Sequence, residues 1–211
     1  KTDPAAGAKG VSLFLVDTKS PGFMRGQNLE KIGQHAGDTS ELFFNDLRVP
    51  QDALLGGVEG QGFVQMMREL PRERLIIGVQ AVYGAKGALY ATLKYVQERQ
   101  AFGQAIGQFQ NTRFTLAQCA SDIAAAEAFL NASVAAYERG ELTPEAASAL
   151  KLHTTEVMGR VTDACLQLFG GYGYMAEYPI SRFWTDARVL RIYGGTSEIM
   201  KELVARSLLG R

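Results

Sequence analysis

Two glutamates separated by four positions are the carboxylates best placed to act as a base. Glu69 and Glu73 flank Pro71 in an arginine-rich stretch. On a continuous helix such a pair shares one face, so the two carboxylates are neighbours only if Pro71 does not break the register. Two interpretations stay open. One is a solvated charged face, which the composition favours, and the other is a carboxylate base that a helix bend directs into a cleft.

A pair of glycines directly before a helix start signal is the second candidate. Gly194 and Gly195 precede Thr196 and Ser197, either of which is a suitable N-cap, with Glu198 close behind. A turn of this kind collects backbone N–H groups and suits an anion or a carbonyl oxygen. The alternative is an ordinary helix cap without a ligand.

The segment 171–176 matches the G-x-G-x-x-A dinucleotide fingerprint. That fingerprint needs a strand before it and a helix directly after it. Here a helical pattern comes before the glycines, and Glu177-Tyr178-Pro179 follows them. We therefore expect a glycine-rich turn that ends a helix, and such a turn can still let a ligand approach the backbone closely.

Other nucleophile and metal signals are weak. Two cysteines, Cys119 and Cys165, do not make a disulfide scaffold, and two histidines cannot build a zinc site of the usual spacing. His153 lies in a helical pattern as a packing or surface residue, and His35 has no nucleophile near it in the sequence. We predict no metal site.

Composition excludes several classes of protein. Hydrophobic residues make up 46% of the 211, which is ordinary for a globular chain. Twenty-two basic and 22 acidic residues balance, so there is no electrostatic footprint for nucleic acid. The longest aliphatic run, Val11–Val16, is far shorter than the ~20 apolar residues of a membrane span. The chain begins at Lys1 without an initiator methionine, which suggests a fragment or a processed piece.

The hydrophobic period changes near residue 57. Residues 1–57 predict strands at Val11–Val16 and from Leu42 towards Val49, too few to close a core of their own. From Gly60 onwards the period is helical, with Pro71 expected to bend or restart the first helix. We predict three long helices and a short last one in an antiparallel bundle. The apolar stripe of the first helix is Leu75, Val79, Val82, Leu89, Leu93 and Val96, and that of the second is Leu116, Ile123, Leu130 and Tyr137. The third helix begins at Thr143-Pro144 and ends at Gly170-Gly171, and the last helix runs from about Thr196 to Leu209.

Together, the motifs resemble the C-terminal half of the flavin-dependent acyl-CoA dehydrogenases, most closely the long-chain type. The matching segments are 10–16, 38–44, 48–50, 59–63, 69–75, 99–103, 109–110, 170–174 and 192–205. The resemblance implies a fragment of a three-domain α/β/α enzyme. It assigns residues 1–57 to the end of the central β domain and 58–211 to a complete C-terminal four-helix bundle, so the fold class is mainly α. The N-terminal domain and the flavin-covering strands of the family would be absent, and the fragment alone would be inactive.

The resemblance also implies a reaction. The family dehydrogenates an acyl-CoA thioester between its α- and β-carbons, in fatty-acid β-oxidation or branched-chain acyl-CoA breakdown, and passes electrons to an electron-transfer flavoprotein. Many members carry the catalytic glutamate at the position of Gly194, which has no side chain here. Long-chain and isovaleryl-type members carry it at the position of Glu73 instead. The resemblance therefore assigns the base to Glu73, with the N–H of Gly194 polarising the thioester carbonyl.

Further residues are assigned by position in the family. Arg74 and Tyr193 would contact the substrate. The residues expected to contact FAD are Arg99, Phe102 and Gln110, then Gln167, Leu168, Gly170 and Gly171 on the adenine side across a subunit interface, and Thr196, Ser197 and Glu198 near the pyrophosphate. An arginine suits pyrophosphate because its charge is fixed and its donors are forked.

The resemblance further implies a homo-oligomer, by the family's habit a tetramer, in a bacterial cytoplasm or a mitochondrial matrix. Two alternatives remain open at this point. One is a non-catalytic relative that serves as an oligomerisation scaffold, and the other is an acyl-CoA oxidase that uses oxygen.

Overall fold

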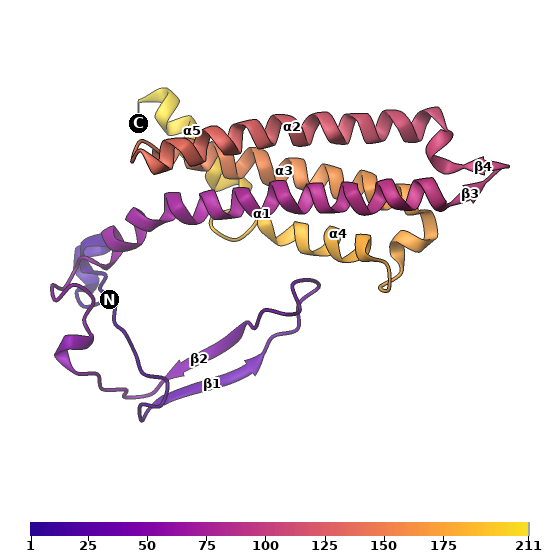
Figure 1. Ribbon diagram of the computed structural model, residues 1–211. Helices are drawn as coiled ribbons and strands as arrows, with labels where there is room; N and C mark the ends of the chain where they lie inside the picture. The colour runs from indigo at the N-terminus through magenta and orange to yellow at the C-terminus, as the bar shows by residue number, and fades with distance from the viewer. Residues whose placement is uncertain (211) are drawn as a thin grey trace. The chain divides into compact units, whose positions relative to one another are not determined.

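The structure, a computed structural model, describes residues 1–210. The chain divides into two compact units, one covering Lys1–Leu70 and the other beginning at Pro71. The α-helices and strands of both units are labelled in Figure 1, and each unit is described by itself. Long helix α1, Gly62–Glu98, begins in the first unit and continues into the second.

The first unit contains one antiparallel hairpin and two short 3₁₀ helices. Strand β1, Phe23–Asn28, pairs with β2, Ser40–Phe44, with an irregularity between Arg25 and Asn28. The rings of Phe23 and Phe44 meet edge to face at 5.6 Å. The 3₁₀ helices are η1, Pro4–Gly10, and η2, Gln51–Ala53.

The two predicted strands of this unit have different outcomes. Leu42–Phe44 is in β2 as predicted, but the strand ends at Phe44 instead of continuing to Val49. Val11–Val16 is not a strand: it is extended and makes a single bridge, Phe14 with Leu54. A run of β-branched residues needs a paired neighbour to become a strand, and here it has only this one bridge.

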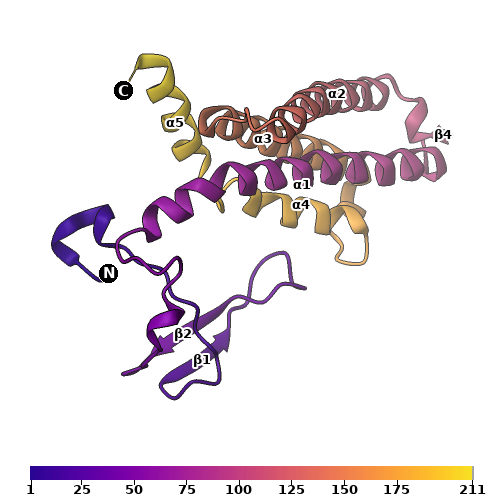
Figure 2. The same cartoon turned by 60° about the vertical axis from the view of Figure 1, so that its left-hand side comes forward.

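The second unit is built from long antiparallel helices. After α1, a two-residue hairpin (β3, Gln100–Ala101, and β4, Gln104–Ala105) and the 3₁₀ turn η3, Ile106–Gln108, lead into α2, Gln110–Glu138. Helix α3, Pro144–Phe169, runs back, and η4, Gly170–Tyr174, follows it. Helices α4, Pro179–Leu190, and α5, Ser197–Leu209, complete the unit. Two views show α2, α3 and α4 lying alongside the second half of α1 (Figures 1 and 2).

The local signals for α3 act as predicted. Thr143 is the N-cap, and its hydroxyl oxygen accepts a hydrogen bond from the N–H of Ala146 at 3.2 Å. Pro144 takes the first helical position, where its missing N–H costs nothing. The helix ends at Phe169 because Gly170 has φ +58°, a conformation that favours glycine.

The helix predictions are met in part. Helix α1 continues through Pro71, so the restart that was one of the two predicted outcomes does not occur. Helix α4 was not predicted, although Pro179 at its first turn and buried Ile180, Ala187 and Leu190 give it a start signal and an apolar face.

The core lies where α3 packs against its neighbours, α2, α4 and α5. Leu150, Val157, Val161 and Cys165 face inward from α3 and are almost completely buried. On α1 the predicted residues Leu75, Val82 and Val96 are buried, and Ala81, Ala85 and Ala88 extend the buried stripe. The predicted core residues Val79 and Leu93 are exposed. Small side chains let α1 approach α3 closely: a Cβ on Gly78 would lie 3.2 Å from the Leu150 side chain.

Candidate functional site

The site begins with an arginine on α1 that the bundle buries. Arg74 is 5% exposed, and burial lowers the pKa of its guanidinium while the neighbouring Glu73 raises it. Its Nη1 donates to Ser148 Oγ of α3 at 3.1 Å, and its Nε donates to the carbonyl oxygen of Gly194 at 3.4 Å. Arg74 therefore joins α1 and α3 to the turn before α5.

A buried lysine on α3 supports the same turn. The Lys151 side chain is fully buried, and its Nζ donates to the carbonyl oxygen of Gly195. Burial, reinforced by the nearby charge of Arg74, lowers the pKa of Lys151 to about 8, although Glu156 acts in the opposite direction. Two cationic side chains thus bind two consecutive carbonyl groups of one turn.

The turn itself depends on its glycines. Gly194 has φ +64° and Gly195 has φ +106°, both in the region that side chains disfavour. A Cβ on Gly194 would lie 2.5 Å from Ile77 Cδ1, and one on Gly195 would lie 2.6 Å from Met200 Cε. Both the backbone conformation and the packing therefore require glycine here.

Three consecutive N–H groups in this turn are available to a ligand. Among the described residues, the peptide N–H groups of Gly194, Gly195 and Thr196 donate to no protein acceptor. Unsatisfied N–H groups side by side, at the start of a helix, suit a carbonyl oxygen or an anion. The structure supports the sequence interpretation of an N–H-rich turn.

Hydrogen bonds at both ends of the turn close it. Glu156 of α3 accepts from Arg191 Nη1 at 3.2 Å and from Ser197 Oγ at 2.8 Å, and the Ser197 N–H donates to the Arg191 carbonyl at 3.1 Å. The hydroxyl of Tyr193 donates to Gln80 Oε1 of α1 at 2.7 Å. The turn is therefore tied to α1 and α3.

Helix α5 starts directly from this turn. Thr196 is the N-cap, with its hydroxyl oxygen 3.4 Å from the N–H of Ile199. Hydrogen bonds from its own backbone N–H and from Thr196 lower the pKa of the exposed Glu198 carboxyl group. Among the residues assigned near the pyrophosphate, Ser197 is buried and already bonded to Glu156, whereas Thr196 still offers its N–H.

The candidate base lies next to the buried arginine. Glu73 is exposed and immediately precedes Arg74 on α1, so its backbone is one helical step from the residue that binds Gly194. Glu69 lies in the first unit. Glu73 is therefore one residue from the side chain that holds the N–H-rich turn, and it is exposed.

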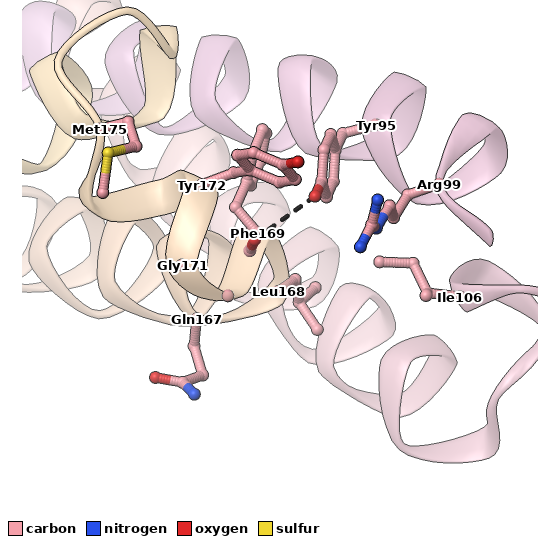
Figure 3. A pocket seen from close by; sticks show the side chains of 10 residues that line it. Tyr95, Arg99, Ile106, Gln167, Leu168, Phe169, Gly171, Tyr172 and Met175 are labelled. Carbon is pink, nitrogen blue, oxygen red and sulfur yellow. Dashed lines mark hydrogen bonds between the residues drawn. The ribbon is translucent and has the colours of Figure 1, made fainter. Parts of the chain in front are cut away.

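A separate cavity of about 540 Å³ lies at the other end of α3. Figure 3 shows Tyr95 and Arg99 facing the residues that end α3 and form η4. Tyr95 stacks on Phe169 with ring centroids 4.0 Å apart, and its hydroxyl donates to the Phe169 carbonyl at 3.4 Å. The guanidinium of Arg99 lies 5.4 Å from the centre of the Tyr172 ring.

This cavity gathers five of the predicted cofactor residues. Its full lining is Tyr95, Arg99, Ile106, Gln167, Leu168, Phe169, Gly170, Gly171, Tyr172 and Met175. A Cβ on Gly170 or Gly171 would meet nothing within 4 Å, so the backbone there is open to a ligand. Segments far apart in the sequence therefore form one concave site within a single chain.

Two other predicted cofactor residues lie outside the cavity lining. Phe102, at the tip of the β3–β4 hairpin, is 96% exposed with φ +52°, and its ring meets Phe109 edge to face at 6.2 Å. Gln110 is exposed at the first position of α2. A nearly bare phenylalanine on a hairpin tip is an unsatisfied apolar surface in this chain.

The motifs in the sequence do not indicate Lys151 or the aromatic stack. A lysine inside a helix is ordinarily taken as solvent-exposed, but the spacing of Ala147, Lys151, Thr154 and Met158 places this one on the buried stripe. Tyr95 and Phe169 carried no motif. The site that they form is visible only in the folded structure, which brings the ends of α1 and α3 together.

Other kinds of site are not seen in residues 1–210. No helix there is long and apolar enough to cross a membrane. The same residues contain no group of three histidine, cysteine or acidic side chains that could hold a metal ion. The chemistry that the described residues support is binding of a polarised oxygen at the glycine turn, proton transfer to a carboxylate, and binding of a flat group beside an arginine.

Fold and site together define a helical-bundle domain with a glycine oxyanion turn at one end and an aromatic cavity at the other. The family model described as "Acyl-CoA dehydrogenase, C-terminal domain" matches residues 60–209. The chain belongs to the acyl-CoA dehydrogenase family.

Individual relatives agree with this assignment. The chain is 46% identical over 202 residues to "Long-chain specific acyl-CoA dehydrogenase, mitochondrial" of Sus scrofa, a match that covers 96% of this chain and 47% of the relative. Its structure is similar to an acyl-CoA dehydrogenase from Geobacillus kaustophilus, with TM-score 0.95, 41% identity, and coverage of 99% and 55% of the two chains. It is also similar to a glutaryl-CoA dehydrogenase from Mycobacterium smegmatis in complex with FADH2, with TM-score 0.91, 27% identity, and coverage of 96% and 52%. The chain spans about half the length of the curated relatives it matches.

Proposed function

We propose that this chain is the C-terminal part of a flavin-dependent acyl-CoA dehydrogenase that converts acyl-CoA thioesters to trans-2-enoyl-CoA. The observation that carries the proposal is the arrangement around Arg74. This buried arginine, next to Glu73 on α1, binds the carbonyl of a glycine turn whose N–H groups are unused. A carboxylate and a group of oxyanion donors in one place are what α-proton removal from a thioester requires.

In the proposed reaction Glu73 is the base. Its carboxylate takes the α-proton, while the Gly194 N–H donates to the thioester oxygen and stabilises the negative charge that develops there. The β-hydrogen leaves as hydride, and the double bond forms between the two carbons. Gly194 cannot itself be the base because it has no side chain, and its position is too crowded to accept a Cβ without moving Ile77.

The cavity at the end of α3 fits part of a flavin dinucleotide. Its volume of about 540 Å³ is within the roughly 300–1,000 Å³ range of small-molecule sites. The rings of Tyr95, Phe169 and Tyr172 offer flat apolar surface, Arg99 offers a fixed positive charge, and Gly170-Gly171 leaves room at the backbone. These features suit an adenine ring followed by a pyrophosphate.

We assign FAD as the cofactor on this basis. Arg99 and the 167–171 segment, together with Phe102 and Gln110, would hold the adenosine side of one FAD molecule, and Thr196 would face the pyrophosphate of another. When bound, FAD supplies the acceptor for the hydride from the β-carbon. The chain's own residues bind it and orient the thioester relative to it.

The geometry favours a cofactor site shared between two copies of the chain. Lys151, beneath the glycine turn, and Gln167, at the cavity, are both on α3 and lie about 24 Å apart at the helical rise per residue. The two sets of flavin residues are therefore two separate places on one chain. We propose that they serve two different cofactor molecules in a homo-oligomer, which we expect to be a tetramer.

The proposed physiological setting follows the family. Electrons would pass from the reduced flavin to an electron-transfer flavoprotein, and the pathway would be fatty-acid β-oxidation or branched-chain acyl-CoA breakdown. The protein would work in a bacterial cytoplasm or a mitochondrial matrix.

Anaerobic mixing of the FAD-loaded full-length protein with a series of acyl-CoA thioesters tests the proposal. We expect loss of the oxidised-flavin absorbance and one trans-2-enoyl-CoA formed for each flavin reduced. Reoxidation by electron-transfer flavoprotein should be much faster than by air. Rapid reoxidation by oxygen with release of hydrogen peroxide would instead indicate an oxidase, and unchanged flavin with every thioester would refute the proposal.

A further inference from the structure

The buried ammonium of Lys151 has no obvious structural purpose. Its side chain is fully enclosed, and its hydrogen-bond partner is the Gly195 carbonyl. Glu156, the carboxylate whose charge acts on Lys151, is already bonded to Arg191 and Ser197, and the charge of a second cation, Arg74, acts on Lys151 as well. Taking a charge out of water without a bonded counter-ion is costly, and an apolar residue of similar length would pack there at lower cost.

What the lysine fixes is the orientation of a peptide group. Glycine pairs have little resistance to rotation of the peptide plane between them, because no Cβ restricts their φ and ψ angles. Arg74 binds the carbonyl of Gly194 and Lys151 binds the carbonyl of Gly195, so two successive peptide planes are held from the bundle interior.

The orientation of the N–H groups in the turn follows from the two carbonyl groups that are held. No peptide bond in residues 1–210 is cis. In a trans peptide the N–H is directed opposite to the C=O. The N–H groups of Gly195 and Thr196 must therefore be directed away from the two buried cations, and these are two of the N–H groups without a protein acceptor.

We propose that Lys151 is a positioning residue, which binds the Gly195 carbonyl and so keeps the glycine turn in one conformation. The Gly194 N–H, at the start of that turn, is thereby kept in place to polarise the thioester carbonyl. This inference rests on the proposed function and adds to it. It assigns a role to a residue that touches neither substrate nor cofactor. Arg74 shares the task at the preceding carbonyl, and the Glu156 network holds both ends of the turn in place.

The direct test measures polarisation of the carbonyl rather than turnover. Product trans-2-enoyl-CoA, ¹³C-labelled at the thioester carbonyl, is bound to the oxidised full-length holoenzyme, and its carbonyl stretch is followed by isotope-edited infrared spectroscopy. In the wild type we expect a clear downshift relative to free ligand. Lys151→Met should lose at least about half of that downshift, because the turn is no longer held.

Two further variants separate positioning from folding. Thr162→Val removes another buried polar group of α3 whose hydroxyl bonds only to helix carbonyls, and it should keep the full downshift. Lys151→Gln keeps an N–H donor without the charge and should restore part of the downshift lost in Lys151→Met.

Single-turnover flavin reduction gives a kinetic measure of the same effect. Lys151→Met should lower the rate at saturating acyl-CoA by about tenfold or more, with the half-saturating concentration changed by less than about threefold.

The outcomes separate the role of Lys151 from the proposed function. A wild-type downshift that Lys151→Met retains in full overturns the role of Lys151 and leaves the proposed function intact. Loss of the folded state in both lysine variants, judged by circular dichroism, also overturns it, because Lys151 would then be a structural residue. No downshift in the wild type, together with flavin that acyl-CoA does not reduce, overturns the proposed function and this inference with it.

Discussion

Arg74 and Lys151 show how single buried charges can determine the geometry of a short turn. Both side chains come from the helices of the bundle, and both end on carbonyls of the Gly194-Gly195 pair. Neither residue is replaceable by a shorter one without losing reach. At this scale the site consists of two side-chain donors on the inside of the turn and free N–H groups on the outside.

The pKa of Lys151 gives a prediction about stability. Its folded value, about 8, is below the ordinary 10.5, so between these values the unfolded chain binds more protons than the folded chain. Unfolding free energy should therefore rise with pH over this window, by an amount on the order of 3 kcal/mol from this residue. The measurement is denaturant unfolding of wild type and Lys151→Met at pH 7.5 and at pH 10.5. We expect the wild type to gain stability relative to the variant, and a constant difference would mean that Lys151 titrates normally.

At the scale of elements, α3 is the structural centre of the second unit. In its first half, Lys151 and Glu156 bind the turn and Ser148 accepts from Arg74, and the helix ends at the aromatic cavity. Correct placement of both sites therefore depends on where α3 starts and stops.

The start of α3 can be tested through its cap. Thr143→Ala removes the side chain that accepts from the Ala146 N–H, and it should destabilise the protein by about 1 kcal/mol. Thr115→Ala, in the second turn of α2, is the matched control. Its hydroxyl donates only to the Asn111 carbonyl of the same helix, and alanine has the higher helix propensity, so stability should be unchanged or slightly greater. Equal unfolding midpoints for Thr143→Ala and wild type would show that the cap does not set the helix start.

The elements also show how much the sequence alone could predict. The boundaries of α3 and α5 follow from local chemistry, namely a threonine cap, a proline at the first position and glycines at the end, and these were predicted closely. Strand β1 was missed because Phe23–Asn28 contains Gly26 and polar residues, and only pairing with β2 makes it a strand. Likewise, Val11–Val16 was overpredicted because β-propensity does not supply a partner.

The glycine turn could be predicted from the sequence better than the aromatic cavity. The glycine turn and Glu73 carry recognisable residue types, so the sequence could identify them. The aromatic cavity combines the end of α1 with the end of α3, and this long-range proximity has no local signal. Lys151 could have been found only by noticing that a charged residue falls on an apolar stripe.

At the scale of the whole molecule, the two proposed flavin-binding regions of one chain lie at different ends of α3, and in the proposed oligomer they would engage separate cofactors. Dilution of the FAD-loaded full-length protein should therefore release flavin as the oligomer dissociates, because mass action couples the two equilibria. The measurement compares molecular mass by light scattering with flavin bound, over a dilution series. The two should fall together, and monomers that keep all of their FAD would show that one chain holds the cofactor alone.

Substitution of Glu73 tests the central claim most directly. The full-length holoenzyme is mixed anaerobically with saturating acyl-CoA, and the rate of flavin reduction is measured in wild type, in Glu73→Gln and in Glu69→Gln as the matched control. Removal of a general base ordinarily costs about 10²–10⁴ in rate, so Glu73→Gln should be slowed by that factor, while Glu69→Gln should stay near the wild-type rate. A Glu73→Gln rate within about tenfold of wild type would contradict the account, because a different residue would then remove the α-proton.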